Sequence, residues 1–392
     1  MSYLEKLLEG VEVEWIPLDK LISVITAPTK LKKEFYRKNG KLPIIDQGIE
    51  YIAGYTDEKF SSVKLDSYII FGDHSEHVKF VDFQFIQGAD GLKILKPKFD
   101  NAKYIYYAFI NFYRKELSYK RHWTSAKETL IPIPFYDKPE KSLGVQKEIV
   151  RILDSFTELT AELTAELTAR KKQYAYYGET LLTFGEEVKH LPMDDESVGA
   201  FQRGKRFVKT DLLSEGIPTI HYGEMYTHYG IWADETKSFV SEELVKSKNL
   251  RTAQKGDVVI VAAGETIEDL GKGTAWLGDE GVVIHDACFS YKTVLNPKFV
   301  AYFTRTKQFH DQIKKHISSG KISAINAKGL GSALIPVPSL AEQERIVGIL
   351  DQFDTLTYSI SEGLPKEIAL RQKQYEYYRN RLLTFPKKEV SA

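Results

Sequence analysis

The pattern of apolar positions along the chain is dominated by two long helical stretches. Apolar residues recur at spacings of three and four between residues 145 and 184, and again between 342 and 385. This spacing predicts helices with a coiled-coil seam. The expected seam residues are Ile149, Ile152, Phe156, Leu159 and Leu163 in the first stretch and Ile346, Ile349, Phe353, Leu356 and Ile360 in the second. Because each helix has one face too apolar to stand alone, we expect an intramolecular, antiparallel pair.

The two helical stretches are copies of each other. VQKEIVRILDSF (145–156) returns as EQERIVGILDQF (342–353), and RKKQYAYYGETLLTF (170–184) returns as RQKQYEYYRNRLLTF (371–385). A continuous helix of roughly 40 residues would span roughly 60 Å. Gly363 and Pro365 are expected to break or kink the second one.

The first helical stretch also holds a shorter repeat, TELTAELTAELTAR at 157–170, built from Thr-Ala-Glu-Leu units. Each unit adds about 6 Å and about 40° of rotation to a helix. Leu159, Leu163 and Leu167 keep one apolar stripe, which favours a helix despite the threonines. The alternative is repeat slippage in a surface helix that tolerates it.

Ahead of each helical stretch lies a region of short Val, Ile, Phe and Tyr runs separated by turn residues, which is typical of mixed, mainly β domains. Matching segments are VEWIP (13–17) with VKHLP (188–192), LPIIDQG (42–48) with IPTIHYG (217–223), KYIYYAF (103–109) with KFVAYF (298–303), and IPIP (131–134) with IPVP (335–338). The third pair is expected to be helical, and the prolines of the fourth suit edge strands.

The expected organisation is therefore an α+β chain with an internal pseudo-twofold repeat. It consists of a domain (1–144), a long helix (145–184), a similar domain (185–341), a second long helix (342–385) and a short tail (386–392).

Composition narrows the class of protein. With 392 residues, 43% of them hydrophobic and 12% aromatic, the chain is globular rather than disordered. Its 54 basic and 54 acidic residues cancel, so nucleic-acid binding would rest on local patches or on partner subunits. The single cysteine, Cys288, excludes a disulfide framework, suits a reducing cytoplasm and is expected in the core. We expect a cytoplasmic protein, because no signal region or membrane-length apolar run is present.

Basic residues gather in two kinds of cluster that recur in both halves. TKLKKEFYRKNGK (29–41) corresponds to RGKRFVK (203–209), and YRKELSYKRHWTSAK (113–127) corresponds to RTKQFHDQIKKHISSGKISAINAK (305–328). Such clusters suit phosphate contacts, with nearby polar and aromatic side chains left to read bases. A single basic run is more often a solvated face, but repetition in register favours a function.

The DNA-contacting candidates follow from these clusters and from strand ends. Gln47, His221 and Tyr222 end predicted strands before a glycine turn, where a loop could enter a groove; core or turn roles stay open for these three. The remaining candidates are Lys30, Lys32, Lys33, Arg37, Lys38, Lys41, Arg114, Lys115, Lys120, Arg121, Trp123, Lys127, Arg203, Lys205, Arg206, Lys209, Lys314, Lys315 and Lys321.

Catalytic motifs are missing from the sequence. There is no Asn-Pro-Pro-Tyr or Asn-Pro-Pro-Phe tetrad, no glycine-rich cofactor loop after a strand and no histidine spacing of a metal site. The run GETIEDLGKGT (264–274) is expected to be a surface turn, and TDEK (56–59) fits a nuclease only as any turn would. We expect no catalysis, cofactor or metal in the isolated chain.

The helical blocks carry a family resemblance. IPVPSLAEQERIVGILDQFDTLT (335–357), RQKQYEYYRNRLLTF (371–385) and the Thr-Ala-Glu-Leu units resemble the specificity subunit of type I restriction-modification enzymes, in the subgroup with such spacer repeats. The resemblance implies two target recognition domains that each read half of a bipartite sequence in double-stranded DNA. It further implies that 145–184 and 342–385 hold these domains apart and dock two modification subunits.

Cofactors in the full complex would lie on the partners. The resemblance implies modification subunits that hold S-adenosylmethionine and methylate adenine N6, and restriction subunits that translocate DNA with ATP and Mg. Base contacts cannot be carried over, because recognition domains vary widely within the family. Two other interpretations stay open: a coiled-coil protein adaptor without a DNA role, and an orphan specificity subunit that serves methylation alone.

The resemblance gives the four-residue repeat a possible purpose. One base pair advances DNA by about 3.4 Å and rotates it by about 35°, which is close to the rotation added by one Thr-Ala-Glu-Leu unit. The hypothesis is that the number of units sets the number of unspecified base pairs between the half-sites.

Overall fold

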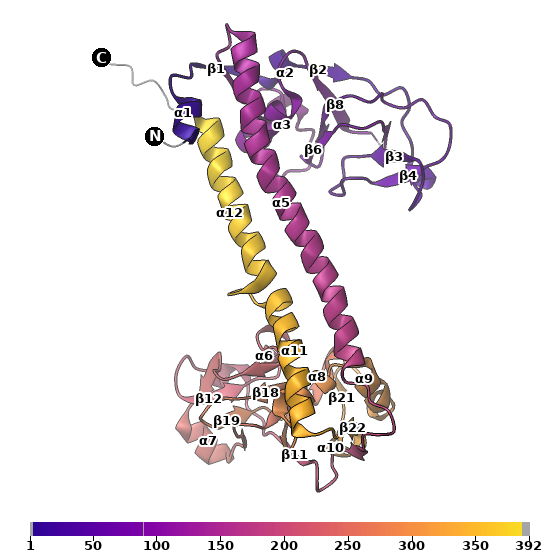
Figure 1. Cartoon of the computed structure of the whole chain (residues 1–392), viewed down its shortest axis with the longest axis vertical. Helices are drawn as coiled ribbons and strands as arrows, with labels where there is room; N and C mark the ends of the chain where they lie inside the picture. The colour runs from indigo at the N-terminus through magenta and orange to yellow at the C-terminus, as the bar shows by residue number, and fades with distance from the viewer. Residues whose placement is uncertain (1–2, 89, 386–392) are drawn as a thin grey trace, which may run out of the picture. The chain divides into compact units, whose positions relative to one another are not determined.

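The structure is a computed structural model that describes residues 3–88 and 90–385 (Figure 1). These residues form two compact units. Unit 1 holds the residues up to Thr164 and those from Glu367 onward, and unit 2 is Ala165–Lys366. The expected tail, 386–392, lies outside the described residues. No helix in the described ranges combines the length and apolarity needed to cross a lipid bilayer.

Unit 1 is built on two β-sheets, ordered β2-β8-β5-β6 and β4-β3-β7, and a two-stranded β1-β9 ribbon. Its strands are β1 (Val13–Pro17), β2 (Ile22–Ile25), β3 (Leu42–Ile45), β4 (Gly54–Thr56), β5 (Tyr68–Gly72), β6 (Val78–Val81), β7 (Ile86–Gln87), β8 (Leu92–Pro97) and β9 (Leu130–Pro134). Its shorter helices are α1 (Tyr3–Leu8), α2 (Leu18–Leu21), the 3-10 turn η1 (Lys33–Phe35), α3 (Ala102–Phe112) and α4 (Trp123–Ala126).

Unit 2 contains sheets ordered β11-β20-β16-β18-β13 and β14-β12-β19-β15, with ribbons β17-β21 and β10-β22. Its strands are β10 (His190–Pro192), β11 (Gly199–Arg203), β12 (Ile217–Ile220), β13 (Trp232–Ala233), β14 (Ser238–Val240), β15 (Thr252–Ala253), β16 (Val258–Val261), β17 (Ala263–Gly264), β18 (Gly273–Trp276), β19 (Val282–Ile284), β20 (Cys288–Thr293), β21 (Ser323–Ala324) and β22 (Leu334–Pro336). Its helices are η2 (Lys209–Asp211), α6 (Glu224–Thr227), α7 (Glu242–Lys248), η3 (Ile267–Asp269), α8 (Pro297–Phe303), α9 (Lys307–Ile313), η4 (Lys314–His316), α10 (Ala327–Gly331) and α11 (Leu340–Tyr358).

The predicted internal repeat is confirmed at the matching segments, although unit 2 has additional strands and helices. β1 pairs with β9 as β10 pairs with β22, both antiparallel, so each domain closes its first strand against its last. β3 and β12 each have one antiparallel and one parallel neighbour. The segments at 103–109 and 298–303 lie in α3 and α8, as expected for helices.

The first long helix, α5 (Pro139–Thr180), runs unbroken through the four-residue repeats. The hydroxyl groups of Thr157, Thr160 and Thr164 donate to backbone carbonyls four residues earlier at 2.7–3.0 Å, which satisfies their polar groups within the helix. The predicted helix is therefore confirmed across the repeats.

Each unit pairs its part of α5 with a C-terminal helix. In unit 1 Phe156 stacks on Tyr378 of α12 (Gly363–Thr384), with ring centroids 5.2 Å apart. In unit 2 Lys171 lies over the ring of Tyr358, whereas Tyr177, further along α5, stacks on Phe353 at 5.4 Å. A later residue of α5 thus contacts an earlier residue of the partner helix, α11. This pairing is therefore antiparallel, as predicted.

The seam is less uniform than the sequence pattern suggested. Ile149 and Ile346 are buried in the cores, whereas Ile152, Phe156, Leu159, Leu163, Ile349, Phe353 and Leu356 are half-buried. Ile360 was wrongly placed in the seam: it lies beyond the end of α11 and is 88% exposed, because the helix stops at Tyr358. A second row of side chains on the same helices is also buried. Val150 and Leu153 belong to the core of unit 1, and their counterparts Val347 and Leu350 belong to the core of unit 2.

The break predicted at Gly363 is confirmed. α11 ends at Tyr358 and α12 begins at Gly363, whose φ of +68° lies in the left-handed region that favours glycine. A Cβ atom there would clash with the carbonyl oxygens of Thr355 and Leu356. The break therefore depends on glycine, which has no Cβ atom, at this position.

Substituting two helix glycines should have opposite effects on stability. Gly363→Ala should lower the free energy of unfolding of unit 2 by about 1–3 kcal/mol, through backbone strain and the clash. Gly348→Ala, in the middle of α11 with open space around its Cβ position, should raise it by about 0.5–1 kcal/mol. Urea unfolding of both variants measures the difference; equal effects would contradict the glycine-dependent break.

Candidate nucleic-acid interface

In both units a polar joint fixes the β-rich domain to its long helix. The helix joint consists of Asn101, Lys103, Tyr107, Gln146 and Asp154 in unit 1, and of Asn296, Lys298, Tyr302, Gln343 and Asp351 in unit 2. In unit 1 Lys103 Nζ lies 2.8 Å from Asp154 Oδ2 and the Tyr107 hydroxyl donates to Asp154 Oδ1 at 2.6 Å. In unit 2 the corresponding distances are both 2.8 Å.

The helix joint also fixes the first residue of the neighbouring short helix, which is α3 in unit 1 and α8 in unit 2. Gln146 Oε1 accepts the backbone N–H of Asn101 at 2.8 Å, and Gln343 Oε1 accepts that of Asn296 at 2.7 Å. Asn101 and Asn296 in turn cap α3 and α8. Burial, reinforced by the Asp154 carboxylate, raises the pKa of Tyr107, so its hydroxyl remains a donor.

Sequence comparison of the two halves could have identified these residues. Asn, Lys and Tyr recur with the same spacing in both copies of the short helix, and Gln and Asp recur with the same spacing in both long helices. The repeated blocks were detected through their apolar residues, whereas the matching polar residues inside them make the contact.

The first basic cluster of unit 1, residues 29–41 and here called its early basic segment, is exposed to solvent. Its cations Lys30, Lys32, Lys33, Arg37, Lys38 and Lys41 all lie on the surface. Lys30 Nζ is 3.0 Å from Asp90 Oδ1, and Arg37 Nη1 donates to the carbonyl of Glu34 at 2.7 Å. Exposed pairs of this kind contribute little to stability, so the segment remains available to phosphates.

The second basic cluster of unit 1, residues 113–127 and here called its late basic segment, contains both exposed and packed residues. Its exposed cations are Arg114, Lys115, Lys120 and Arg121. Lys120 forms an ion pair with Glu116. Trp123 is half-buried, with its ring centroid 5.9 Å from that of Phe71, so its indole ring is largely part of the core. Lys127 is half-buried beside Glu128.

Gln47 connects the two basic segments of unit 1. Its Oε1 accepts the backbone N–H of His74 at 3.3 Å, and its Nε2 donates to the carbonyl of Asp90, the ion-pair partner of Lys30, at 3.2 Å. The ring of His74 stacks on Tyr119 in the late basic segment, with centroids 6.0 Å apart. Lys30, Gln47 and the late basic segment therefore converge on one edge of unit 1.

In unit 2 a cluster of rings occupies the equivalent strand end. His221 and Tyr222 follow β12, and their rings lie 4.7 and 5.1 Å from that of His285, which follows β19. Phe207 completes the cluster, 5.0 Å from His285. His285 Nδ1 accepts the N–H of Ala287, which leaves Nε2 to donate to the carbonyl of Phe207 at 2.9 Å, so the neutral tautomer fits.

The early basic segment of unit 2 lies beside this ring cluster. Arg203 Nε donates to the carbonyl of Asp286 at 2.9 Å, and Lys205 Nζ donates to the carbonyl of Lys248 at 3.4 Å. Arg206 and Lys209 are exposed. Cations and flat rings are therefore brought together at one place. Of this arrangement the sequence predicted only that His221 and Tyr222 follow the end of a strand, which is β12.

In the late basic segment of unit 2, residues 305–328, the candidate lysines follow α9. Lys314 and Lys315 lie in η4, and Lys321 lies in the next loop; all three are exposed. Ile317, between them, packs against the same apolar cluster as Tyr222. The late segment and Tyr222 therefore share one apolar cluster.

The remaining sequence features that could have carried chemistry are the single cysteine, the glycine-containing run at 264–274 and possible metal ligands. Cys288 is buried in β20, where burial raises the pKa of its thiol to about 12, so its predicted core position is confirmed. The run at 264–274 is only partly the expected surface turn, because Gly273 and Thr274 are buried in β18. Within the described ranges, no group of His, Cys, Asp and Glu side chains is arranged to share a metal ion.

Comparison with known proteins gives consistent matches over both halves. The family model described as type I restriction modification DNA specificity domain matches residues 11–170 and 196–370. The EcoR124I/EcoR124II specificity subunit of Escherichia coli is 40% identical, covering 100% of this chain and 98% of its own length. The putative type I restriction enzyme specificity subunit S.HindORF215P of Haemophilus influenzae is 34% identical, covering 98% of each chain.

Solved structures share the fold. The S subunit of a type I restriction-modification system from M. genitalium superposes with a TM-score of 0.57 at 18% identity, over 99% of this chain and 100% of that one. A chain from a study of complex assembly and conformational transition of the type I R-M system gives a TM-score of 0.55 at 14% identity, over 97% of this chain and 99% of that one.

The ring cluster should make unit 2 sensitive to mild acid. Burial lowers the pKa of both His285 and His221, so the unfolded chain, with histidine pKa values near 6.5, takes up protons first. The free energy of unfolding should therefore fall as pH decreases from about 7 to 5. His285→Gln should reduce this slope in urea unfolding at several pH values; an unchanged slope would contradict the assignment.

Proposed function

Because the chain belongs to the family of type I restriction-modification DNA specificity subunits, we propose that it selects the DNA sequence on which its partner subunits act. The observation that carries this proposal is the repeated convergence of basic segments on a strand end, once in each unit. Phosphate contacts supply affinity, and side chains such as Gln47 and His221 have the hydrogen-bonding groups to read base edges.

Two reading edges suit a bipartite target. Each unit would read one half-site, with residues 1–144 and 185–341 as the exchangeable recognition domains. The edges differ in chemistry: an amide and a tyrosine-bearing loop in unit 1, and a histidine-rich ring cluster in unit 2. Different half-sites are therefore expected. Because the chain has no net charge, affinity should rise strongly when partner subunits enclose the DNA.

The long helices offer two equivalent surfaces for modification subunits. Tyr176 in unit 2 and Tyr377 in unit 1 occupy matching positions in the repeated block, and they are 64% and 55% exposed. Their neighbours Tyr177 and Tyr378 pack inward on Phe353 and Phe156. Large apolar side chains held outward at repeated positions are typical of protein contacts, which supports two modification subunits, one for each unit.

The partner subunits would carry out the catalytic reactions. We assign S-adenosylmethionine and adenine methylation to the modification subunits, and ATP with Mg to restriction subunits that join the complex. The chain itself would provide recognition and assembly. The adaptor interpretation is not favoured, because the family match covers both halves of the chain.

The proposed function is tested by mapping methylation. The chain and its modification subunit, expressed in a host without other methylation, should produce N6-methyladenine at one motif with two short specific blocks around a fixed gap. Single-molecule sequencing of the host genome measures this, and the modification subunit alone should give none. A complex that assembles and binds S-adenosylmethionine but methylates no such motif would support the adaptor.

The repeat length should set the gap. Deleting residues 160–163, one four-residue unit of α5, should shorten the unspecified gap by about one base pair and leave both half-sites unchanged. Thr160→Ala keeps the helix length and serves as the control, with an unchanged gap. Methylome sequencing reads both; if the deletion also leaves the gap unchanged, the helix is not the ruler.

A further inference from the structure

A loop in unit 1 presents two apolar side chains to water among cations. The tip loop, residues 114–121, carries Leu117, which is 85% exposed, and Tyr119, which is 98% exposed. Arg114, Lys115, Lys120 and Arg121 surround them in the sequence. Single exposed apolar residues are common on protein surfaces, so exposure alone assigns no role. The backbone that holds Leu117 outward is more informative.

The backbone of the tip loop is strained at Leu117. Its φ of +53° lies in the left-handed region, which residues with a Cβ atom rarely occupy. Glu76, in the loop after β5, has a φ of +55° and is only 2% exposed. Such outliers persist where surrounding contacts enforce them, and they gather at functional sites.

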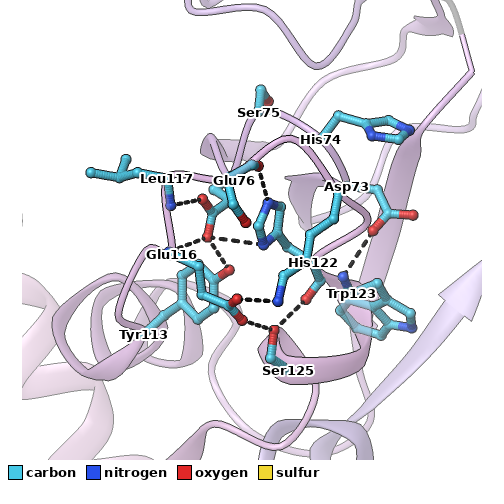
Figure 2. A network of polar contacts seen from close by, with 12 residues as sticks. Asp73, His74, Ser75, Glu76, Tyr113, Glu116, Leu117, His122, Trp123 and Ser125 are labelled. Atoms are coloured by element: carbon cyan, nitrogen blue, oxygen red, sulfur yellow. Dashed lines mark hydrogen bonds and ion pairs between the residues drawn. The ribbon is translucent and has the colours of Figure 1, made fainter.

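The buried Glu76 carboxylate enforces the conformation of the tip loop (Figure 2). Glu76 Oε1 accepts the Tyr113 hydroxyl at 2.6 Å and the backbone N–H of Glu116 at 2.8 Å. Glu76 Oε2 accepts the backbone N–H of Leu117 at 2.9 Å. Burial alone would raise the pKa of Glu76, but these hydrogen bonds outweigh it and hold the pKa below its usual range.

A second anchor fixes the other end of the tip loop. The ring of His122 is fully buried, and its Nε2 lies 2.8 Å from the carbonyl oxygen of Ser118. The backbone N–H of His122 donates to the carbonyl of Asp73, and that of Trp123 donates to Asp73 Oδ1, both at 2.8 Å (Figure 2). Hydrogen bonds therefore hold both ends of the tip loop without a ligand, and such preorganisation lowers the entropy cost of binding.

We propose that Leu117 is a wedge that enters the stack between two adjacent base pairs in the half-site read by unit 1. Tyr119 packs beside the opened step, and the surrounding cations hold the flanking phosphates. Glu76 is a positioning residue that keeps Leu117 pointed outward. Apolar side chains such as leucine unstack and kink duplex DNA in this way. The proposal rests on the proposed function, since it takes duplex DNA as the ligand.

Unit 2 is built differently at the matching place. Its late loop exposes Ile322, which is 63% exposed, beside Lys321. Among the described residues of 314–322, none has a positive φ, and Ser318 returns to pair with Ala324. The kink is therefore expected in one half-site only.

The test uses the full chain in complex with its modification subunit and duplexes that carry the methylated motif. 2-Aminopurine replaces adenine at successive positions across both half-sites. Wild-type protein should raise the fluorescence several-fold at one step in a single half-site, in addition to any signal at the methylated adenine. Leu117→Ala should remove the step signal, keep the signal at the methylated adenine and weaken specific binding about tenfold.

Two further variants separate the wedge from general effects. Phe99→Ala is the matched control, because Phe99 is 86% exposed in unit 1 but lies outside the tip loop; it should behave as wild type. Glu76→Gln replaces one acceptor with an amide NH2 that faces backbone donors. It should reduce the step signal although Leu117 is intact, while recognition of the other half-site is retained, which a role in general stability would not produce.

Each contrary outcome has a distinct meaning. A methylated bipartite motif without a step signal would overturn the wedge and leave the proposed function intact. Loss of modification-subunit binding in Leu117→Ala would show that the tip loop contacts protein instead of DNA. Absence of any bipartite methylation would overturn both proposals.

Discussion

A charge-assisted contact between one aspartate of each long helix and a lysine and tyrosine of the neighbouring short helix is the constraint on which each unit depends. Asp154 and Asp351 each receive a cation and a hydroxyl, and ionised hydrogen bonds of this kind are stronger and more directional than neutral ones. Rotating a β-rich domain about its own helix would break both bonds at once. The loops that carry the basic residues therefore inherit a fixed orientation relative to the helix on which their domain is mounted.

The internal repeat separates what the two halves share from what distinguishes them. The helix joint, the first-to-last strand pairing and the inward tyrosines of the long helices occur twice with nearly the same geometry. The strand ends differ: unit 1 places Gln47 and the tip loop there, whereas unit 2 places His221 and His285. A common frame with different edges is the arrangement expected of a molecule that makes two different recognitions with one mechanical design.

Local sequence patterns predicted the elements well and the long-range contacts poorly. Helical periodicity located α5, and the positive φ of Gly363 explains why the expected break occurs there. The same periodicity wrongly extended the seam to Ile360, because it does not register where a helix stops. Basic runs identified exposed cations but not their convergence. Glu76 was missed entirely, since its partners lie some forty residues later and no local pattern signals a buried carboxylate.

The discontinuity of unit 1 has a consequence for biosynthesis. Leu382 and Leu383, near the end of α12, are buried in the same core as Leu8 and Ile149, whereas unit 2 is a single continuous segment. On the ribosome unit 2 can therefore close before unit 1. At about 5–20 residues per second, the first domain waits roughly 10–40 s for its last helix. During that interval its unfilled apolar surface is a natural substrate for a chaperone.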